Sequence, residues 1–580
     1  MAKPPGSYIL LTRLFLRQFL ENDMLSPDSD RSQLLAIAGA SVISLTLFIS
    51  MFMSSPYAMS ILMPAHAAVL TLNDKFFYCS LAMLVTALTA AAQWDALALD
   101  QRDAAILQPL PVKNGTLRAA KLTAVALLGA GVALAVNAFP TWVFPWMVSF
   151  AVPQMTVGQL FVSMGVHAVI TVSAAVFGFL AIIALRESVS ALLGPRLFTR
   201  VSPALQTATI MALGVALLLL PLSTSRTAER GLAGWRIELP SMAFVGAYET
   251  VSGGFLAELP RRPMTVPQAA RDFSASYVYA DRQPLFGPLM QRAQLLLLGV
   301  TVVVAIATGL NVLRGFAGGA LAPARRRRSR FDGLARAIFS GSAASRAGFD
   351  FGVATLWRSK THRLTLACAA AVGLAMVMVS LPSVDPGSGS VPARLLAIQP
   401  LLYGSLLAGF RHLVRIPAEL RANWGFQMAW RGQVRDFASG VQMAAYMTLA
   451  VPAILATLPP VAMVAGLPFA VAHALLGLLG AAVFLEALML AYEKVPFTCS
   501  YVPSENKAMA PVYVGMFLIG ATMFARLELN ILTGARTFLG VMGLVMLFVS
   551  LKVMTGRRRR VADVDFNEGP EGYQRLGLHS

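Results

Sequence analysis

Long blocks of apolar residues, separated by short polar stretches, dominate the pattern along this chain. A helix needs about 18 to 20 apolar residues to cross roughly 30 Å of hydrocarbon at about 1.5 Å per residue. Twelve blocks reach or approach this length, and the shortest of them contains Pro400. We place the twelve predicted spans at 34–53, 76–94, 120–138, 157–185, 203–222, 293–312, 364–381, 395–411, 438–458, 467–491, 511–530 and 537–554.

The composition agrees with a chain that lies in a bilayer. Hydrophobic residues make up 57% of the sequence, charged residues only 13%, and the mean hydropathy is +0.66. Soluble globular proteins average roughly 25% charged residues. The sequence therefore predicts an all-α polytopic membrane protein with about twelve transmembrane helices.

The distribution of Lys and Arg predicts the orientation. Basic residues near short loops remain on the cytoplasmic side. With the N-terminus inside, 35 of the 47 Lys and Arg fall in cytoplasmic segments, and eight of the other 12 lie in the long segment 223–292. We expect cytoplasmic N- and C-termini in the bacterial inner membrane, and we interpret the net charge of +19 as an orientation signal rather than a nucleic-acid surface.

The spans divide six and six around a basic stretch that contains Arg325, Arg326, Arg327, Arg328 and Arg330. The predicted domains are a first six-helix half (1–321) with an extracytoplasmic segment (223–292) between spans five and six, a basic cytoplasmic linker (322–346), a second six-helix half (347–556) and a cytoplasmic tail (557–580).

Each half also begins with an amphipathic segment, Tyr8–Leu25 or Phe349–Leu364, in which Lys or Arg interrupts apolar residues. Such a helix lies along a membrane surface. The second segment is equally compatible with an extension of the following span.

Each half places its most polar cytoplasmic loop between its second and third spans, at 94–117 and 411–437. This shared placement suggests a fused duplication, although the two halves show no repeat at the level of residues. In the first loop a charged run precedes Pro109, Leu110 and Pro111, and proline ends a helix abruptly. The loop therefore predicts a short surface helix, whose charged residues are Asp95, Asp100, Arg102 and Asp103.

This run resembles the membrane subunits of ABC-2-type exporters, which have a charged run leading into a Pro-Leu-Pro turn after the second span. The surface helix before the first span and the excursion between spans five and six fit the same resemblance. It implies that Asp95, Asp100, Arg102, Asp103, Pro109, Leu110 and Pro111 form a coupling loop that docks on a separate cytoplasmic ABC ATPase.

The equivalent loop of the second half, 411–437, contains Pro417 and lacks the Pro-Leu-Pro turn. Proline suits a first helical turn, and an acidic residue is favourable near the positive end of the helix dipole. We consider this a second possible docking loop, with Glu419, Arg421, Asn423 and Trp424 as its candidate residues.

Motifs for chemistry within this chain are absent from the sequence. It has no phosphate-binding loop and no H-E-x-x-H zinc motif, and its three cysteines, Cys79, Cys368 and Cys499, share no C-x-x-C spacing. We predict no enzymatic activity, no catalytic residue, no metal site and no cofactor in this chain, with ATP bound by the partner subunit.

Ionisable residues inside the predicted spans are few. We expect Arg526 and Glu528 to snorkel or to pair with each other, Glu486 to reach the inner headgroups, and His167 and His473 to be buried and isolated.

The expected function is the permease subunit of an ABC exporter for a hydrophobic or amphipathic substrate. The alternatives are an ion-coupled secondary transporter, which would need intramembrane acids such as Glu486 or Glu528, and a non-transporting membrane scaffold or assembly factor.

Overall fold

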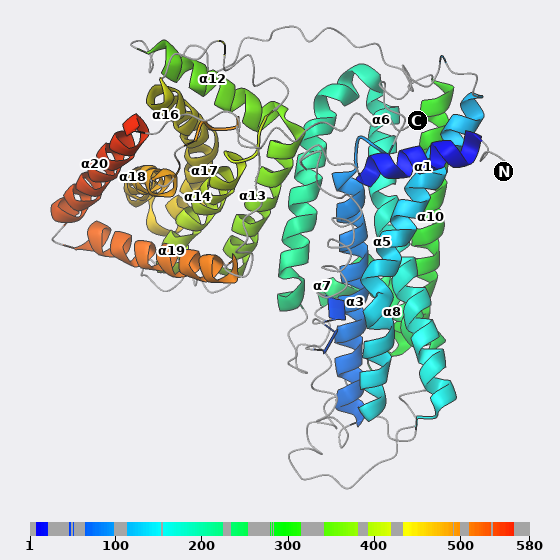
Figure 1. Cartoon of the computed structure of the whole chain (residues 1–580). Coiled ribbons are helices and arrows are strands. Elements are labelled where there is room, and N and C mark those ends of the chain that lie inside the picture. Colours follow the sequence, from blue (N-terminus) through cyan, green and yellow to red (C-terminus); the bar gives the residue numbers. More distant parts are fainter. Residues whose placement is uncertain are drawn as a thin grey trace, which may run out of the picture. The chain divides into compact units, whose positions relative to one another are not determined.

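The computed structural model describes residues 7–20, 64–97, 113–151, 155–223, 234–252, 283–314, 342–380, 393–418, 433–490, 494–498, 510–534 and 537–561, with isolated positions between them. The described part is all-α and contains no strand. The chain forms two compact units, and the division between them follows Leu321 (Figure 1).

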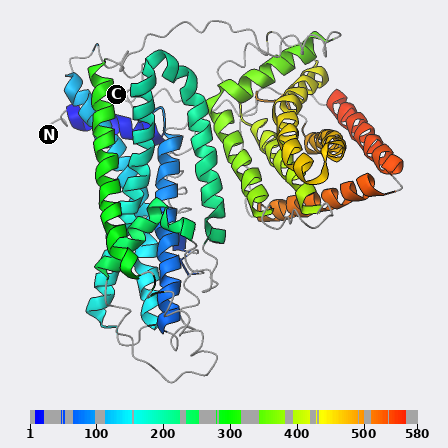
Figure 2. The same cartoon turned by 180° about the vertical axis from the view of Figure 1, so that it is seen from behind.

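Long helices that run side by side build the first unit, as Figures 1 and 2 show from opposite sides. Its elements are α1 (Ser7–Leu20), α3 (Pro64–Ala92), α5 (Asn114–Ala151), α6 (Val157–Ser223), α7 (Gly234–Ile237), α8 (Pro240–Val251), the 3-10 turn η3 (Gln283–Leu285) and α10 (Phe286–Leu313).

Helix α6 bends sharply at Gly194, with a φ of 69° and a ψ of 169°. Glycine adopts a positive φ at little cost, and the following Pro195 favours an extended ψ at the residue before it. A straight helix of this length would measure roughly 100 Å, about three times the thickness of a hydrocarbon core. The bend therefore divides α6 into two segments, each long enough to cross a bilayer.

The second unit contains shorter helices. They are α12 (Ala343–Arg358), α13 (Lys360–Ser380), α14 (Ala393–Leu413), α16 (Val434–Ala445), the π-helical turn η6 (Tyr446–Ala450), α17 (Val451–Ala465), α18 (Leu467–Met489), α19 (Ala510–Thr533) and α20 (Thr537–Val561). The π turn lies inside one continuous helical path from α16 to α17, and Gly466, with a φ of 85°, makes the tight connection to α18.

One helix forms the centre of each unit, and in both units it corresponds to the second predicted span. In the most apolar 18-residue window of α3, 72% of the residues are buried, and in that of α14, 67%. The next most buried candidate span has 44%. Helix α3 contacts α5, α6 and α8, and helix α14 contacts α13, α17, α18 and α19.

A separate helix precedes the bundle in each unit and packs on the helix that follows the polar loop. Helix α1 buries Leu11 and Phe15, and the Tyr8 hydroxyl lies 2.7 Å from the Thr123 hydroxyl of α5. Helix α12 packs on α16 so closely that a Cβ at Gly440 would lie 1.9 Å from the carbonyl oxygen of Ser345.

Ser359 separates α12 from α13, with an extended ψ of 123°. The segment before the seventh predicted span is therefore a helix in its own right rather than an extension of that span.

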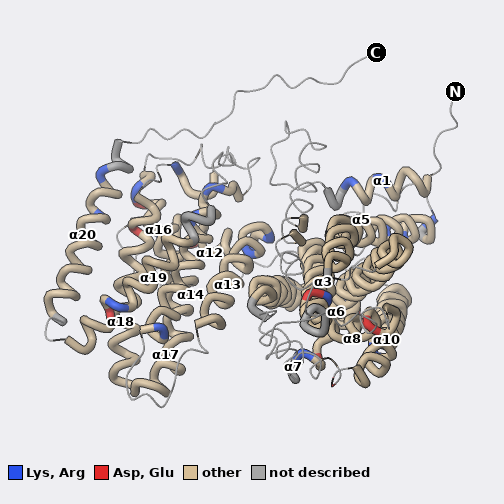
Figure 3. Tube along the Cα trace, turned by 90° about the horizontal axis from the view of Figure 1, so that it is seen from below, with Lys and Arg blue, Asp and Glu red and all other residues tan. Residues whose placement is uncertain are grey.

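Figure 3 marks Lys and Arg on α1, α12 and α20, while most positions along the described helices are neither basic nor acidic.

Ten candidate membrane spans occur among the described residues, and one of them, Val157–Pro221, is the bent helix that covers two predicted spans. Eleven of the twelve predicted spans thus coincide with described helices, while 34–53 falls largely outside the described residues. The described chain is a polytopic α-helical protein whose apolar helices suit a lipid bilayer.

Candidate functional site

The first predicted docking loop starts from a fixed point on the bundle. At the end of α3, Trp94 is buried and its indole donates a hydrogen bond of 2.9 Å to the Ser202 hydroxyl of α6. One turn earlier, Gln206 of α6 donates to the Ala91 carbonyl at 2.9 Å. The start of the loop is therefore attached to the second segment of α6.

Two residues of this predicted site are described, and both are exposed: Asp95, in the turn after α3, and Pro109. The others lie outside the described residues, namely Asp100, Arg102, Asp103, Leu110 and Pro111. Their role in docking remains a prediction.

The second predicted loop starts from a similar fixed point. After α14, the Val414 carbonyl accepts hydrogen bonds from the Tyr492 hydroxyl at 2.7 Å and from the backbone N–H of Phe497 at 2.9 Å. The Ile416 carbonyl lies 3.1 Å from Nε2 of His362 on α13. The predicted docking residues Glu419, Arg421, Asn423 and Trp424 lie outside the described residues.

Phe497 has a backbone conformation that is rare for a bulky residue, with a φ of 65°. Its carbonyl accepts from the N–H of Ala418 at 2.9 Å, and its ring packs against His362 and Phe410 with centroids 5.2 and 6.3 Å away. Strained conformations of this kind persist only where the surroundings impose them, and they cluster at functional sites. The contacts fix the beginning of the second loop.

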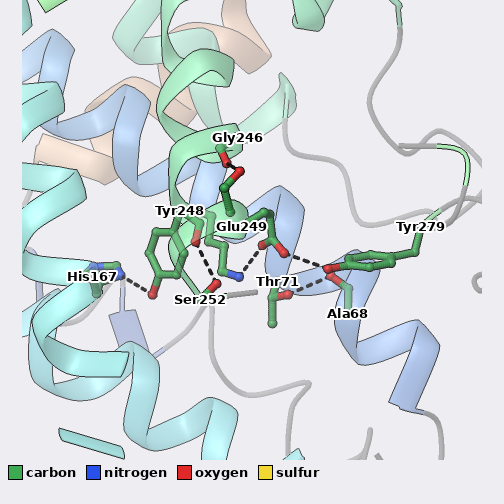
Figure 4. Close-up of polar contacts among 10 residues, drawn as sticks. Ala68, Thr71, His167, Gly246, Tyr248, Glu249, Ser252 and Tyr279 are labelled. Carbon is green, nitrogen blue, oxygen red and sulfur yellow. Dashed lines mark hydrogen bonds and ion pairs between the residues drawn. The ribbon is translucent and has the colours of Figure 1, made fainter. Parts of the chain in front are cut away.

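A buried ion pair joins the short helix α8 to the central helix of the first unit (Figure 4). The Lys75 ammonium of α3 donates to the carboxylate of Glu249, and the two side chains are 5% and 3% exposed. The second oxygen of Glu249 accepts from the Tyr279 hydroxyl at 2.8 Å. The lysine also lies 4.4 Å from the centroid of the Tyr248 ring.

Aromatic residues extend this cluster into the bundle. The Tyr248 hydroxyl lies 3.4 Å from Nδ1 of His167 on α6, and the His167 ring packs against Tyr78 and Phe144. Burial and the nearby Glu249 carboxylate raise the pKa of Tyr248 and of Tyr279 well above the ordinary value. Both phenols are therefore neutral hydrogen-bond donors at physiological pH.

A third contact fixes the approach to α8. Arg236 of α7 donates to the Asn73 side chain at 3.4 Å, and burial lowers the pKa of its guanidinium. Arg292 of α10 donates to the carbonyls of Ile237 and Glu238 at 3.0 and 2.7 Å. Helices α3, α7, α8 and α10 thus form one polar joint, in which the ammonium and the carboxylate compensate each other.

A second buried pair lies inside the second unit, between α18 and α19. Nδ1 of His473 is 2.6 Å from Oε1 of Glu528, and both side chains are 1% exposed. The expectation that His473 is isolated is therefore wrong, and Glu528 pairs with this histidine rather than with the exposed Arg526. The two residues are 55 positions apart, so sequence spacing gave no signal of the pair.

Among the described residues, no group of three or more His, Cys, Asp or Glu is arranged to hold a metal ion. Buried Cys79 and exposed Cys368 are both free thiols. The candidate site consists of the fixed starts of the two loops, the buried Lys75–Glu249 ion pair and the buried His473–Glu528 contact.

Sequence reasoning missed the Lys75–Glu249 joint because it placed both residues outside the spans. The only signal was the run Asn73, Asp74 and Lys75 immediately before an apolar block, and one sequence cannot reveal the partner of such a run.

The chain was compared with models of known protein families, with curated proteins and with solved structures, and none of them matches it.

Proposed function

We propose that this chain is the membrane permease of an ABC-type exporter, with twelve spans in two six-helix halves and both termini in the cytoplasm. A separately encoded ATPase docks on the loops after the second span of each half and drives a hydrophobic or amphipathic substrate outward. The resemblance of the first loop to ABC-2-type membrane subunits is the origin of this proposal.

One observation carries it furthest: in both units the loop after the second span starts at a point bonded to other helices. A docking loop transmits motion only if its ends are rigid relative to the spans. Trp94 and Gln206 provide this rigidity in the first unit, and Val414 with Phe497 provides it in the second. Since each loop follows the most buried helix of its unit, a force on the loop acts directly on the centre of the bundle.

The matched arrangement of the units also supports a duplicated permease. A separate helix, α1 or α12, packs on the helix after the polar loop, α5 or α16, and the second span is central in both units. Such exporters require a pair of six-helix bundles, and one chain with two halves can supply the pair.

The test is recovery of the ATPase. The chain is purified from its host membranes in mild detergent, and the co-purifying subunits are searched for a protein with a phosphate-binding loop. Combined Arg102→Glu and Asp103→Arg substitutions should reduce its recovery at least about tenfold, the equivalent of about 1.4 kcal/mol of binding free energy. Membrane insertion and abundance should not change.

The matched control is Arg326→Glu with Arg327→Glu in the basic linker, which reverses two charges away from the loop and should leave recovery within about twofold of the parent. Absence of any phosphate-loop subunit, or equal recovery with the Arg102 and Asp103 variant, would remove the basis of the proposal.

A further inference from the structure

The buried pair of the second unit lies on α18 and α19, and both of these helices pack on α14. His473 belongs to α18 and Glu528 to α19, while Gln399 comes from α14 and donates to the Thr457 hydroxyl of α17 at 3.3 Å. Glycines on α18 make this approach possible: a Cβ at Gly477 would lie 1.8 Å from the Gln399 side-chain oxygen, and one at Gly480 would lie 3.0 Å from the Tyr403 hydroxyl.

Three atoms of this group are buried without a hydrogen-bond partner among the described residues: Nε2 of His473, Oε2 of Glu528 and Oε1 of Gln399. An unpaired buried polar atom costs free energy, so a stable bundle normally has few of them. Ionisable groups inside membrane helices are rare and usually functional for the same reason.

We propose that His473 and Glu528 form a site that binds and releases one proton inside the second unit. In the unloaded state the imidazole holds a proton on Nδ1 and donates it to the ionised carboxylate. An incoming proton binds Nε2, and the Nδ1 proton then passes to Oε1 across the 2.6 Å contact. The result is a neutral carboxylic acid beside a neutral imidazole, and the charge of the pair changes from −1 to zero.

The surroundings favour such an exchange because no other described charge faces the pair. Among the titratable groups of neighbouring elements, Tyr403 on α14 interacts electrostatically with Glu528, and the Tyr446 hydroxyl in η6 donates to the Leu478 carbonyl at 2.8 Å. Helix α17 offers only Thr457. The described basic residues of α20 begin at Lys552, about 22 Å along the helix from its first residue.

Lysine would not serve this purpose. An ammonium has a single nitrogen, whereas imidazole has two ring nitrogens and can take up a proton at Nε2 while it passes one on from Nδ1. An ATP-driven permease does not need such a site for energy. The inference therefore goes beyond the proposed function, and its test requires no ATPase.

The test is infrared difference spectroscopy of the purified chain in liposomes, between acidic and alkaline buffer. We expect the carbonyl band of a neutral carboxylic acid to appear on the acidic side and to be lost in Glu528→Gln. Glu486→Gln is the matched control, because Glu486 lies on α18 and is only partly buried, and it should retain the band.

A second variant tests the role of the imidazole. His473→Gln keeps Glu528 but removes its titrating partner, and it should displace the midpoint of the band by at least about one pH unit. The proposal is overturned by a parent spectrum without a titrating carboxyl band, by retention of that band in Glu528→Gln, or by an unchanged midpoint in His473→Gln. Circular dichroism identifies any variant that is not folded, and the parent titration then decides.

Discussion

Each unit has a buried contact between a basic side chain and a carboxylate that joins two helices, but the two units place this contact differently and build it from different bases. In the first unit Lys75 pairs with Glu249, and the pair joins the short helix α8 to the central helix α3. In the second unit His473 pairs with Glu528 between the two long helices α18 and α19, both of which pack on the central helix α14. An ammonium holds its partner carboxylate in the ionised form, whereas an imidazole can pass a proton to the carboxylate that it contacts. The first pair is thus suited to a permanent joint, and the second to a reversible one.

The largest effect should follow from Lys75→Met, because the change leaves the Glu249 carboxylate buried without its cation. Removal of one partner from a buried pair costs about 3–5 kcal/mol. We expect a loss of this size in the free energy of unfolding, measured by denaturant titration in mixed micelles. The double variant with Glu249→Gln should recover part of the loss. Equal stability of the single and double variants would mean that the Lys75–Glu249 pair does not stabilise the contact between α8 and α3.

In the second unit, His473→Leu should cost less, about 1–3 kcal/mol, because the Glu528 carboxyl can take up a proton and become neutral. The same titration in mixed micelles measures it. A loss as large as that of Lys75→Met would show that this pair is also permanently ionic, and the distinction between the two units would fail.

Glu528→Gln also separates the energy sources: transport should persist if an ATPase drives it and should stop if proton flow does.

Substitution of one glycine in each unit allows the tightness of helix packing in the two units to be compared. A Cβ at Gly178 on α6 would lie 2.3 Å from the backbone oxygen of Met83, so α3 and α6 would have to separate. We expect Gly178→Ala to cost about 1–3 kcal/mol. Gly477→Ala instead meets the end of the Gln399 side chain, which can rotate at the loss of one hydrogen bond, about 0.5–1.5 kcal/mol. Thermal unfolding of both variants in detergent decides the order, and a more costly Gly477→Ala would reverse it.

The smallest change in stability should come from a cysteine substitution in the segment 223–292, which only the first unit possesses. Labelling of this cysteine also tests the topology. Val251 ends α8 and is exposed, so Val251→Cys should cost less than about 0.5 kcal/mol in a chain whose native cysteines are replaced. An impermeant thiol reagent should reach it from the outer side of the membrane, and it should reach Ser329→Cys in the linker from the inner side. Labelling of both from one side would contradict the twelve-span topology.

The sequence predicted the spans better than their partners. Apolar block length depends on local composition, so α13, α14 and α18 lie close to their expected positions. Helix α3 begins at Pro64, twelve residues before the predicted span. The polar residues Asn73, Asp74 and Lys75 predicted a boundary, whereas the folded helix continues through them and buries them. The pairs Lys75–Glu249 and His473–Glu528 join residues 174 and 55 positions apart. Only the packing of helices brings such residues together, and one sequence does not contain that information.

The π-helical turn at Tyr446–Ala450 has a consequence for tolerance of insertions and deletions in the second unit. Each residue of an α-helix advances the helix by about 100°, and a π turn accommodates one residue more than an α turn. Deletion of a single residue from this turn would restore a regular helix and leave α17 close to its present orientation about its own axis, whereas deletion of a residue from the α-helical part would rotate α17 by about 100°. Thr457 would then leave Gln399, and the Pro459–Pro460 face would turn toward different neighbours. The turn is thus a position where this span can lose one residue without rotating α17, whereas its α-helical parts cannot.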